Sequence, residues 1–170
     1  VLCFLAPYIT PYARDTVDVV APVRPAPPGT VTAAGQHLLG IDHLGRDLFT
    51  RLLYAGRISL TIAIFVVLIS ESLGVMIGAI AGYFGGWVDD LTMRLADMQL
   101  AFPFILLAIM FLVVLGPGVG NLILVLGIGQ WVTYARIVRA ETLSLREKEF
   151  VEAARALGDG TVSILFRTIL

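Results

Sequence analysis

The sequence contains few cysteines, few charged residues and no surplus of one charge sign. Cys3 is the only cysteine among 170 residues, so no disulfide can form within the chain. The 12 basic and 13 acidic residues give a formal net charge of -1, which lacks the basic surplus typical of nucleic-acid-binding proteins. We therefore exclude a disulfide-stapled scaffold and expect no nucleic-acid partner.

Motifs that carry enzymatic chemistry are also missing. The sequence has no GxSxG, CxxC or HExxH string, and its only lysine, Lys148, lies in REKEF rather than in a phosphate loop ending in GK[ST]. His37 and His43 have no cysteine or carboxylate at ligand spacing, which favours polar loop residues over a metal site. We expect no catalytic residues, no metal and no cofactor in this chain, so any ATP must be bound by another chain.

Apolar residues are abundant and clustered. They make up 58% of the chain and charged residues 15%, against about 45–50% and about 25% in soluble domains. A membrane-spanning helix needs about 20 mostly apolar residues. Three runs reach or approach this length: 59–84, whose only charge is Glu71; 100–116, which has none; and 121–135, which is shorter and contains Gln130. These runs predict an all-α, multi-pass membrane protein, a polytopic helical bundle.

The two ends of the sequence resemble parts of further helices. Residues 1–9 are apolar but too short to span, and they lack the basic region and cleavage site of a signal peptide. We interpret them as the end of a first transmembrane helix. Residues 161–170 begin another apolar stretch after Gly158-Asp159-Gly160. We therefore expect a chain truncated at both ends.

The distribution of basic residues predicts the orientation in the membrane. Half of the 12 basic residues lie between 136 and 167, whereas the turn at 116–120 has none. Because basic loops stay on the cytoplasmic side, the 136–160 loop and, by parity, the 86–99 turn are predicted to be cytoplasmic. The segment 10–57 then lies outside. Residues 10–35 are rich in Pro, Ala, Val and Thr around a Pro-rich stretch at 22–29, and they predict irregular, solvated chain, with a Pro-rich recognition ligand as the alternative.

Two features stand out inside the first predicted span. Gly74, Gly78 and Gly82 recur every four residues, so they share one helix face and would let a neighbouring backbone approach closely. Glu71 is an intramembrane carboxylate, which is costly to bury and suggests a proton relay or cavity lining. Its alternative is a carboxylate that faces the bundle interior, protonated or hydrogen-bonded to a neighbour.

A cytoplasmic amphipathic helix is predicted over 141–157. Its residues favour helix, Gly158 is placed as a C-terminal stop, and a small apolar stripe lies among charges: Phe150, Val151, Ala154 and Leu157. Such a stripe is suited either to the membrane surface or to a groove on a partner protein.

Several strings resemble the permeases of ABC importers. The EAARALG string at 152–158 is similar to the EAA…G loop of that family, its coupling helix. The segments 37–60 and 81–103, with GPGVGN at 116–121, resemble the C-type permeases of the dipeptide, oligopeptide and nickel group. The resemblance covers about 38–170 and implies a type I ABC importer transmembrane domain over 58–170. Glu71 departs from the family, which is typically apolar there.

The resemblance implies a role and a set of partners. It implies a bacterial or archaeal cytoplasmic-membrane protein that forms half of a translocation path for peptides or nickel, with a second permease, two ATP-binding subunits and an extracytoplasmic substrate-binding protein. Contact with the ATP-binding subunit would fall on six residues: Glu152, Ala153, Ala154, Arg155, Leu157 and Gly158. The alternative function is an ion- or proton-coupled carrier or channel that uses Glu71 as an intramembrane relay; a membrane-embedded enzyme lacks any paired catalytic constellation.

Overall fold

The computed structural model describes residues 2–10, 12–13 and 25–169, which fall into two compact units, Val1–Thr61 and Ile62–Leu170. In the first unit, α1 (Ala6–Ile9) is a single short turn of helix. It is the only described helix within the predicted end of a first span at 1–9.

The segment predicted to be irregular contains a small β-hairpin. Strand β1 (Thr30–Thr32) pairs antiparallel with β2 (Gly35–His37), with Thr30 opposite His37. An isolated bridge joins Ala26 to Ile41, whose side chain is fully buried. The prediction of irregular chain over 10–35 is therefore wrong for 30–35, which contain β1 and the start of β2. In β1, TVT consists of β-branched residues, which favour strands. Residues 22–24 of the Pro-rich stretch lie outside the described residues.

Helix α2 (Leu48–Phe84) is the longest element of the chain. Its 37 residues extend about 55 Å at 1.5 Å per residue, which exceeds the roughly 30 Å of bilayer hydrocarbon. The predicted span 59–84 is contained in α2, but the helix begins ten residues before the predicted boundary at 58. Asp47 starts it, because its carboxylate accepts the backbone N–H of Thr50 at 2.7 Å, which is an N-cap contact.

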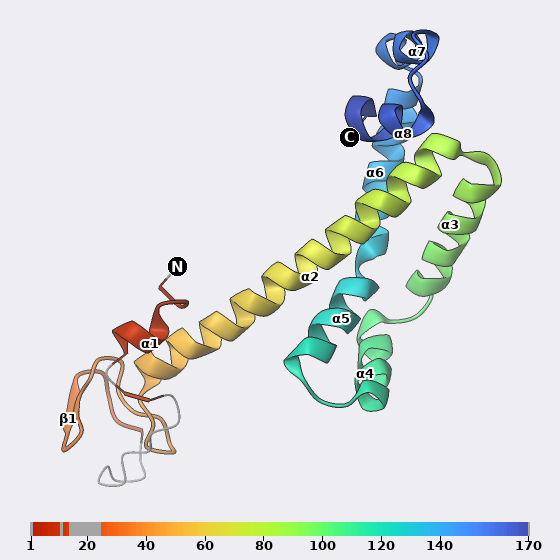
Figure 1. Ribbon diagram of the computed structural model, residues 1–170. Coiled ribbons are helices and arrows are strands. Elements are labelled where there is room, and N and C mark those ends of the chain that lie inside the picture. Colours follow the sequence, from red (N-terminus) through yellow and green to blue (C-terminus); the bar gives the residue numbers. More distant parts are fainter. Residues whose placement is uncertain (1, 11, 14–24, 170) are drawn as a thin grey trace. The chain divides into compact units, whose positions relative to one another are not determined.

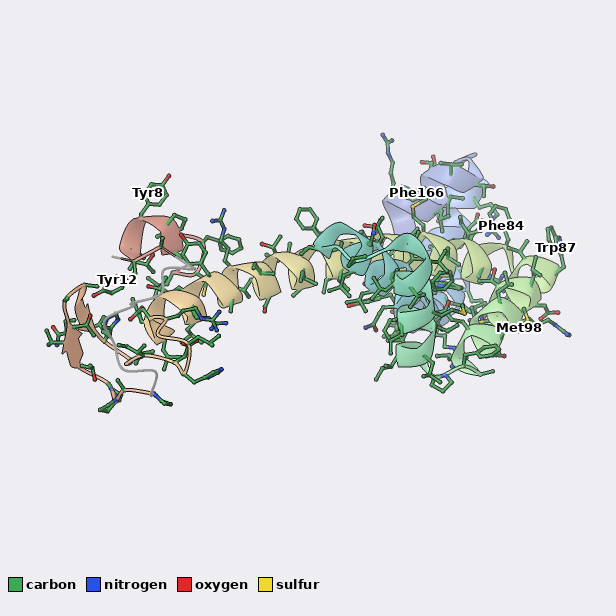
Figure 2. The ribbon with its side chains drawn as sticks, turned by 90° about the horizontal axis from the view of Figure 1, so that it is seen from below. Tyr8, Tyr12, Phe84, Trp87, Met98 and Phe166 are labelled. Atoms are coloured by element: carbon green, nitrogen blue, oxygen red, sulfur yellow. The ribbon has the colours of Figure 1, made fainter. Side chains whose placement is uncertain are left out.

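The second unit continues with short helices that fold back on one another (Figure 1). In Figure 1, α7 and the α2–α3 turn lie at one end of this unit, and the turn between α4 and α5 lies at the other. Phe84 and Trp87 project from the α2–α3 turn (Figure 2), and 76% of the Trp87 surface is exposed. The elements after α2 are α3 (Gly86–Leu100), α4 (Phe104–Leu115), α5 (Val119–Gly129), α6 (Trp131–Arg146), α7 (Glu149–Ala156), α8 (Thr161–Ser163) and the π-helix η1 (Ile164–Ile169).

The second predicted span is wrong in its bounds. Residues 86–99 form helix α3 instead of a turn, and α4 begins at Phe104 rather than at residue 100. The 12 residues of α4 extend only about 18 Å, too short to cross a bilayer alone. The break has a local cause, because Pro103 disfavours helical backbone at the preceding residue, Phe102. The chain bends by 86° between α3 and α4.

The third predicted span and the amphipathic helix also have different bounds. The span predicted at 121–135 extends through α5 and α6 from Val119 to Arg146, with Gln130 between the two helices. The helix predicted over 141–157 is two helices, because α6 ends at Arg146 and α7 starts at Glu149. Among the described residues, two helices are long and apolar enough to cross a membrane, or three when α3 and α4 count as one broken span.

Candidate functional site

Helix α7 presents the predicted coupling residues at the surface. Ala154 is partly exposed and the other five are exposed, with Leu157 at 87% of its full accessibility. Acidic residues occupy the first turn of α7 and Arg155 the last, as the helix dipole favours. The six residues are Glu152, Ala153, Ala154, Arg155, Leu157 and Gly158.

One member of the predicted apolar stripe faces inward. Val151 is fully buried, and α7 packs against η1, in which Ile164 and Leu165 are buried. Phe150 and Leu157 remain exposed. The stripe is therefore divided: Val151 anchors α7 to its own chain, and the remaining apolar surface is open to a partner.

Gly158 ends α7 by a specific backbone geometry. Its φ is +89°, in the left-handed region that favours glycine. Its N–H donates to the carbonyl of Arg155 at 3.1 Å, and the N–H of Asp159 donates to the carbonyl of Ala154 at 3.1 Å. This pair of bonds is a Schellman motif, which explains why the EAA string is followed by a glycine at this distance.

The end of α6, directly before α7, is tied to the end of α2. The Arg146 guanidinium donates to the backbone carbonyl of Tyr83 at 3.2 Å and to that of Gly82 at 3.4 Å. These carbonyls belong to the last turn of α2, where a cation also complements the helix dipole. A shift of the α6–α7 junction therefore acts directly on the α2–α3 turn.

The three glycines of α2 lie against α6. A Cβ at Gly74 would come within 2.4 Å of the Cβ of Tyr134, and one at Gly78 within 2.4 Å of the Ala135 carbonyl oxygen. One at Gly82 would come within 2.8 Å of α6 atoms. Because contacts advance along both helices together, α2 and α6 run in the same direction with their backbones in close approach.

Ion pairs join α3 to α6. Arg139 holds Asp89 with two hydrogen bonds, one from Nε and one from Nη2, in the bidentate arrangement that fixes both groups. The Asp89 side chain is 14% exposed. A second, more exposed pair joins Arg136 to Asp97. From the sequence, these arginines and aspartates were placed in two segments predicted to be cytoplasmic, but they were not paired.

The two helix breaks are linked by a glutamine that sequence reasoning missed. The indole Nε1 of Trp131 donates to Gln99 Oε1 at 2.8 Å, and Gln99 Nε2 donates to the Gly129 carbonyl. Gln99 lies in the last turn of α3, just before the Pro103 break, while Gly129 and Trp131 flank the Gln130 break. Polar residues next to Pro and Gly interruptions in apolar sequence are the signal that identifies such a site.

Glu71 projects from α2 without a partner among the described residues. Its side chain is exposed, and no hydrogen bond or ion pair joins it to them. The neighbouring Ser72 donates to the Leu68 carbonyl at 2.6 Å, within the helix. Glu71 therefore takes no part in the glycine contacts and ion pairs that join α2, α3 and α6.

The histidines have different surroundings, and neither belongs to a cluster of three metal-ligating side chains among the described residues. His43 is exposed. His37 is buried, and its Nδ1 lies 2.9 Å from Asp47 Oδ1 while its Nε2 lies 3.0 Å from Thr32 Oγ1. His37 therefore joins the β-hairpin to the residue that caps α2.

Asp42 organises the turn that precedes α2. Burial raises the pKa of its carboxyl, but hydrogen bonds from the N–H groups of Arg46 and Leu44 and from the guanidiniums of Arg46 and Arg51 outweigh this, so the pKa falls well below its ordinary range. The carboxylate stays ionised and fixes the chain ahead of the helix. In the sequence, this turn corresponds to the string D-x-x-G-R-D at 42–47.

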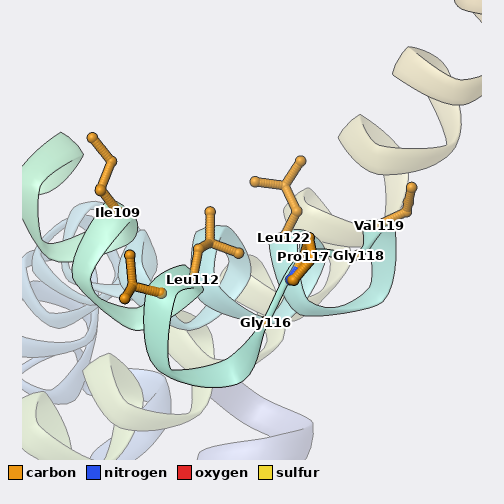
Figure 3. Close-up of a pocket in the computed structure, with 8 residues that line it drawn as sticks. Ile109, Leu112, Gly116, Pro117, Gly118, Val119 and Leu122 are labelled. Carbon is orange, nitrogen blue, oxygen red and sulfur yellow. The ribbon is translucent and has the colours of Figure 1, made fainter.

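Two apolar pockets lie along α4 and α5. One, of about 610 Å³, opens at the α4–α5 turn and is lined mainly by aliphatic side chains such as Ile109, Leu112 and Leu122 (Figure 3). The other, of about 640 Å³, includes Gln99 and the aromatic rings of Phe104 and Phe111. Helices α4 and α5 thus carry apolar surface, whereas α3 and α6 carry the ion pairs.

Comparison with known proteins gives consistent matches. The family model described as binding-protein-dependent transport system inner membrane component matches residues 74–170. The glutathione transport system permease protein GsiD of Pectobacterium atrosepticum is 38% identical over 169 residues, 99% of this chain and 54% of that protein. The nickel transport system permease protein NikC of Escherichia coli K12 is 42% identical over 154 residues, 91% of this chain and 53% of that protein.

A third relative gives the same picture. The dipeptide transport system permease protein DppC of Alkalihalophilus pseudofirmus is 42% identical over 137 residues, 81% of this chain and 45% of that protein. The chain thus spans about half the length of the curated relatives it matches.

Proposed function

The chain belongs to the family of binding-protein-dependent transport system inner membrane components, and from this premise we propose that it is a permease subunit of an ATP-driven importer. In that role it forms half of a translocation path across the cytoplasmic membrane, opposite a second permease subunit. ATP hydrolysis takes place on two separate ATP-binding subunits, and an extracytoplasmic binding protein delivers the substrate. The chain itself performs no catalysis and holds no cofactor.

The exposed face of α7 is the observation that carries this proposal. The helix is anchored through buried Val151, while Ala153, Ala154 and Leu157 reach the surface. Small side chains allow a partner to approach closely, and the exposed leucine supplies apolar area for docking. Charged Glu152 and Arg155 form the rim of this docking face.

The arrangement of the second unit transmits a movement of α7. The helix follows α6 after two residues, α6 contacts α2 through the glycine face, and Arg139 fixes α3. Close-packed helices shift between discrete arrangements rather than deform continuously, so they move together. A displacement imposed on α7 by an ATP-binding subunit therefore reaches three helices of the bundle.

The orientation of the chain in the membrane follows from the charges at the end of the second unit that contains α7. Helices α2 and α6 both run toward the end that holds α7, and the basic residues Arg146, Lys148 and Arg155 gather there. This end faces the cytoplasm by the positive-inside rule, with Trp87 at the membrane interface. The α4–α5 turn faces the opposite side.

The substrate class rests on the relatives alone. The names of the three relatives specify glutathione, nickel and dipeptides. We therefore propose a peptide, or nickel, as the transported substrate.

The comparisons support this permease function and give no support to an ion- or proton-coupled carrier that uses Glu71. Uptake that survives Glu71→Gln but stops when ATP is depleted is the expected result.

Substitutions on α7 test the proposed function in the complete transporter. Ala154→Asp places a charge on the docking face without touching the backbone, and Gly158→Arg adds bulk beside it. Both are expected to abolish uptake and weaken co-purification with the ATP-binding subunits, while membrane insertion stays normal. Gly158→Asn is the matched control, because asparagine tolerates the left-handed conformation and keeps the helix end intact. Normal uptake by Ala154→Asp and Gly158→Arg would contradict the assignment.

A further inference from the structure

The second unit contains two groups of helices that are held together in different ways. We call α2 from residue 62 onward, α3 and α6 the clamp, and α4 with α5 the hairpin. Within the clamp, α2 and α6 are in backbone contact at the glycine face, and α3 is fixed by the Asp89–Arg139 pair. Within the hairpin, α4 and α5 pack along each other, and Asn121 Nδ2 closes the turn by donating to the Leu115 and Gly116 carbonyls at 2.9 and 3.0 Å.

Along the chain, the hairpin is joined to the clamp at two helix breaks. It also contacts α2 within one turn of the second break, where a Cβ at Gly127 would come within 2.9 Å of the Ile69 side chain. One break, 101–103, separates α3 from α4 with an 86° bend. The other is the single residue Gln130, whose φ of −101° and ψ of 0° lie off the helical values of its neighbours. Both connections are therefore interruptions of regular helix, which is where a φ/ψ change is absorbed most readily.

The two breaks are also adjacent in space. A Cβ at Gly129 would come within 2.2 Å of the Phe104 ring, so the start of α4 lies directly against the end of α5. Gln99 bridges the same place, accepting from Trp131 and donating to the Gly129 carbonyl. Two neighbouring breaks define one axis, about which the hairpin can turn as a single piece.

The chemistry of Gln99 suits this position. Trp131 offers only an N–H donor and Gly129 only a carbonyl acceptor, and a glutamine amide is the side chain that satisfies both at once. Its carbonyl and amide ends thus engage α6 and the end of α5 together. Each of these groups would be costly to leave unpaired in a bilayer.

We propose that the α4–α5 hairpin pivots about the paired breaks during transport and that Gln99 is the positioning residue that holds the two breaks in register. The proposal rests on the proposed function, since it assigns the moving part of the same permease. The clamp follows α7, and Gln99 passes its movement to the hairpin. Loss of Gln99 uncouples the hairpin while it leaves α7 docked.

Transport assays on the complete transporter in proteoliposomes provide the first test. Gln99→Leu is expected to lower the maximal uptake rate about tenfold, the loss equivalent to two hydrogen bonds, with an unchanged KM for substrate and continued ATP hydrolysis. Trp131→Phe removes one of the two bonds and should lower the rate about threefold. Thr133→Val is the matched control, because this α6 side chain is exposed, makes no hydrogen bond to the described residues and lies outside both breaks.

Spin-label distances measure the pivot directly. In a Cys3→Ser background of the same transporter, labels at Trp87 and Val114 report clamp against hairpin; both side chains are more than three-quarters exposed, at 76% and 79%. This distance should shift between the nucleotide-free and the ATP-trapped state. The pair at Trp87 and Ile137 lies within the clamp, the pair at Val114 and Leu124 lies within the hairpin, and both distances should stay fixed.

The outcomes separate this inference from the proposed function. If the wild-type transporter shows no ATP-dependent uptake, the proposed function itself fails. If it transports normally and Gln99→Leu does so too, or if the distance between 87 and 114 stays constant through the cycle, the pivot is refuted while the permease function stands. A reduced amount of assembled complex with an unchanged uptake per ATP would show a structural role only, and would also overturn the proposal.

Discussion

Different interactions hold the helices of the clamp together and the helices of the hairpin together, although both groups lie in one unit. The clamp is held by close backbone contact at Gly78 and by the bidentate Asp89–Arg139 pair, both of which require fixed geometry. The hairpin is almost wholly apolar, and much of its surface is exposed, as at Val113 and Val114. In a bilayer, an apolar helix face is solvated by lipid about as well as by protein, so apolar packing gives the hairpin little preference for one position. The backbone contacts and the ion pair of the clamp favour a single arrangement.

The largest effect is expected where the clamp helices touch. Gly78→Ala forces a methyl group to within 2.4 Å of the Ala135 carbonyl oxygen, so α2 and α6 must separate. We expect a loss of about 3 kcal/mol, measured as a lower Tm of the purified transporter in detergent. Gly120→Ala, in the hairpin, is the matched control, because a Cβ there meets nothing within 4 Å. Equal Tm values for the two variants would remove the distinction between clamp and hairpin.

A smaller effect is expected at the ion pairs of the clamp. Arg139→Ala leaves the Asp89 carboxylate unpaired at 14% exposure, and should cost about 2 kcal/mol. Arg136→Ala breaks the pair with Asp97, whose side chain is 69% exposed, and should cost less than about 1 kcal/mol.

Exchange of the partners tests whether the attraction itself matters. The double variant Asp89→Arg/Arg139→Asp should recover part of the Tm lost by either single variant. A double variant no better than the singles would show that this pair does not hold α3 to α6.

The most localised effect is expected at the tip of the hairpin. Asn121→Ala removes two hydrogen bonds to the carbonyls of Leu115 and Gly116 and should cost about 1 kcal/mol, confined to the α4–α5 turn. Hydrogen exchange should speed up at 115–121 and stay unchanged in α6. Faster exchange in α6 would mean that the hairpin and the clamp form one cooperative unit.

The sequence identified features that depend on neighbours along the chain. The four-residue spacing of Gly74, Gly78 and Gly82 predicted one face, because the helix period alone places these residues together. Gly158 was predicted as a helix stop for a similarly local reason, because the positive φ that ends the helix is adopted by this one residue. Apolar length was sufficient to identify the membrane class.

The features that were not predicted from the sequence depend on contacts between segments that are far apart in the chain. Asp89 and Arg139 are separated by 50 residues, and no spacing rule pairs them. The bend at 101–103 was missed because the apolar run 100–116 continues through Pro103 without a charge to mark the break. The link from Gln99 to Trp131 joins two breaks, neither of which the hydropathy pattern revealed.

Photo-crosslinking can detect the proposed contact between α7 and an ATP-binding subunit. A photoreactive amino acid at Leu157, 87% exposed on the docking face, is compared with one at Val113, 78% exposed in the hairpin, in membranes that contain the complete transporter. We expect a crosslink to the ATP-binding subunit from position 157 and none from position 113. No crosslink from position 157, or equal crosslinks from both positions, would contradict it.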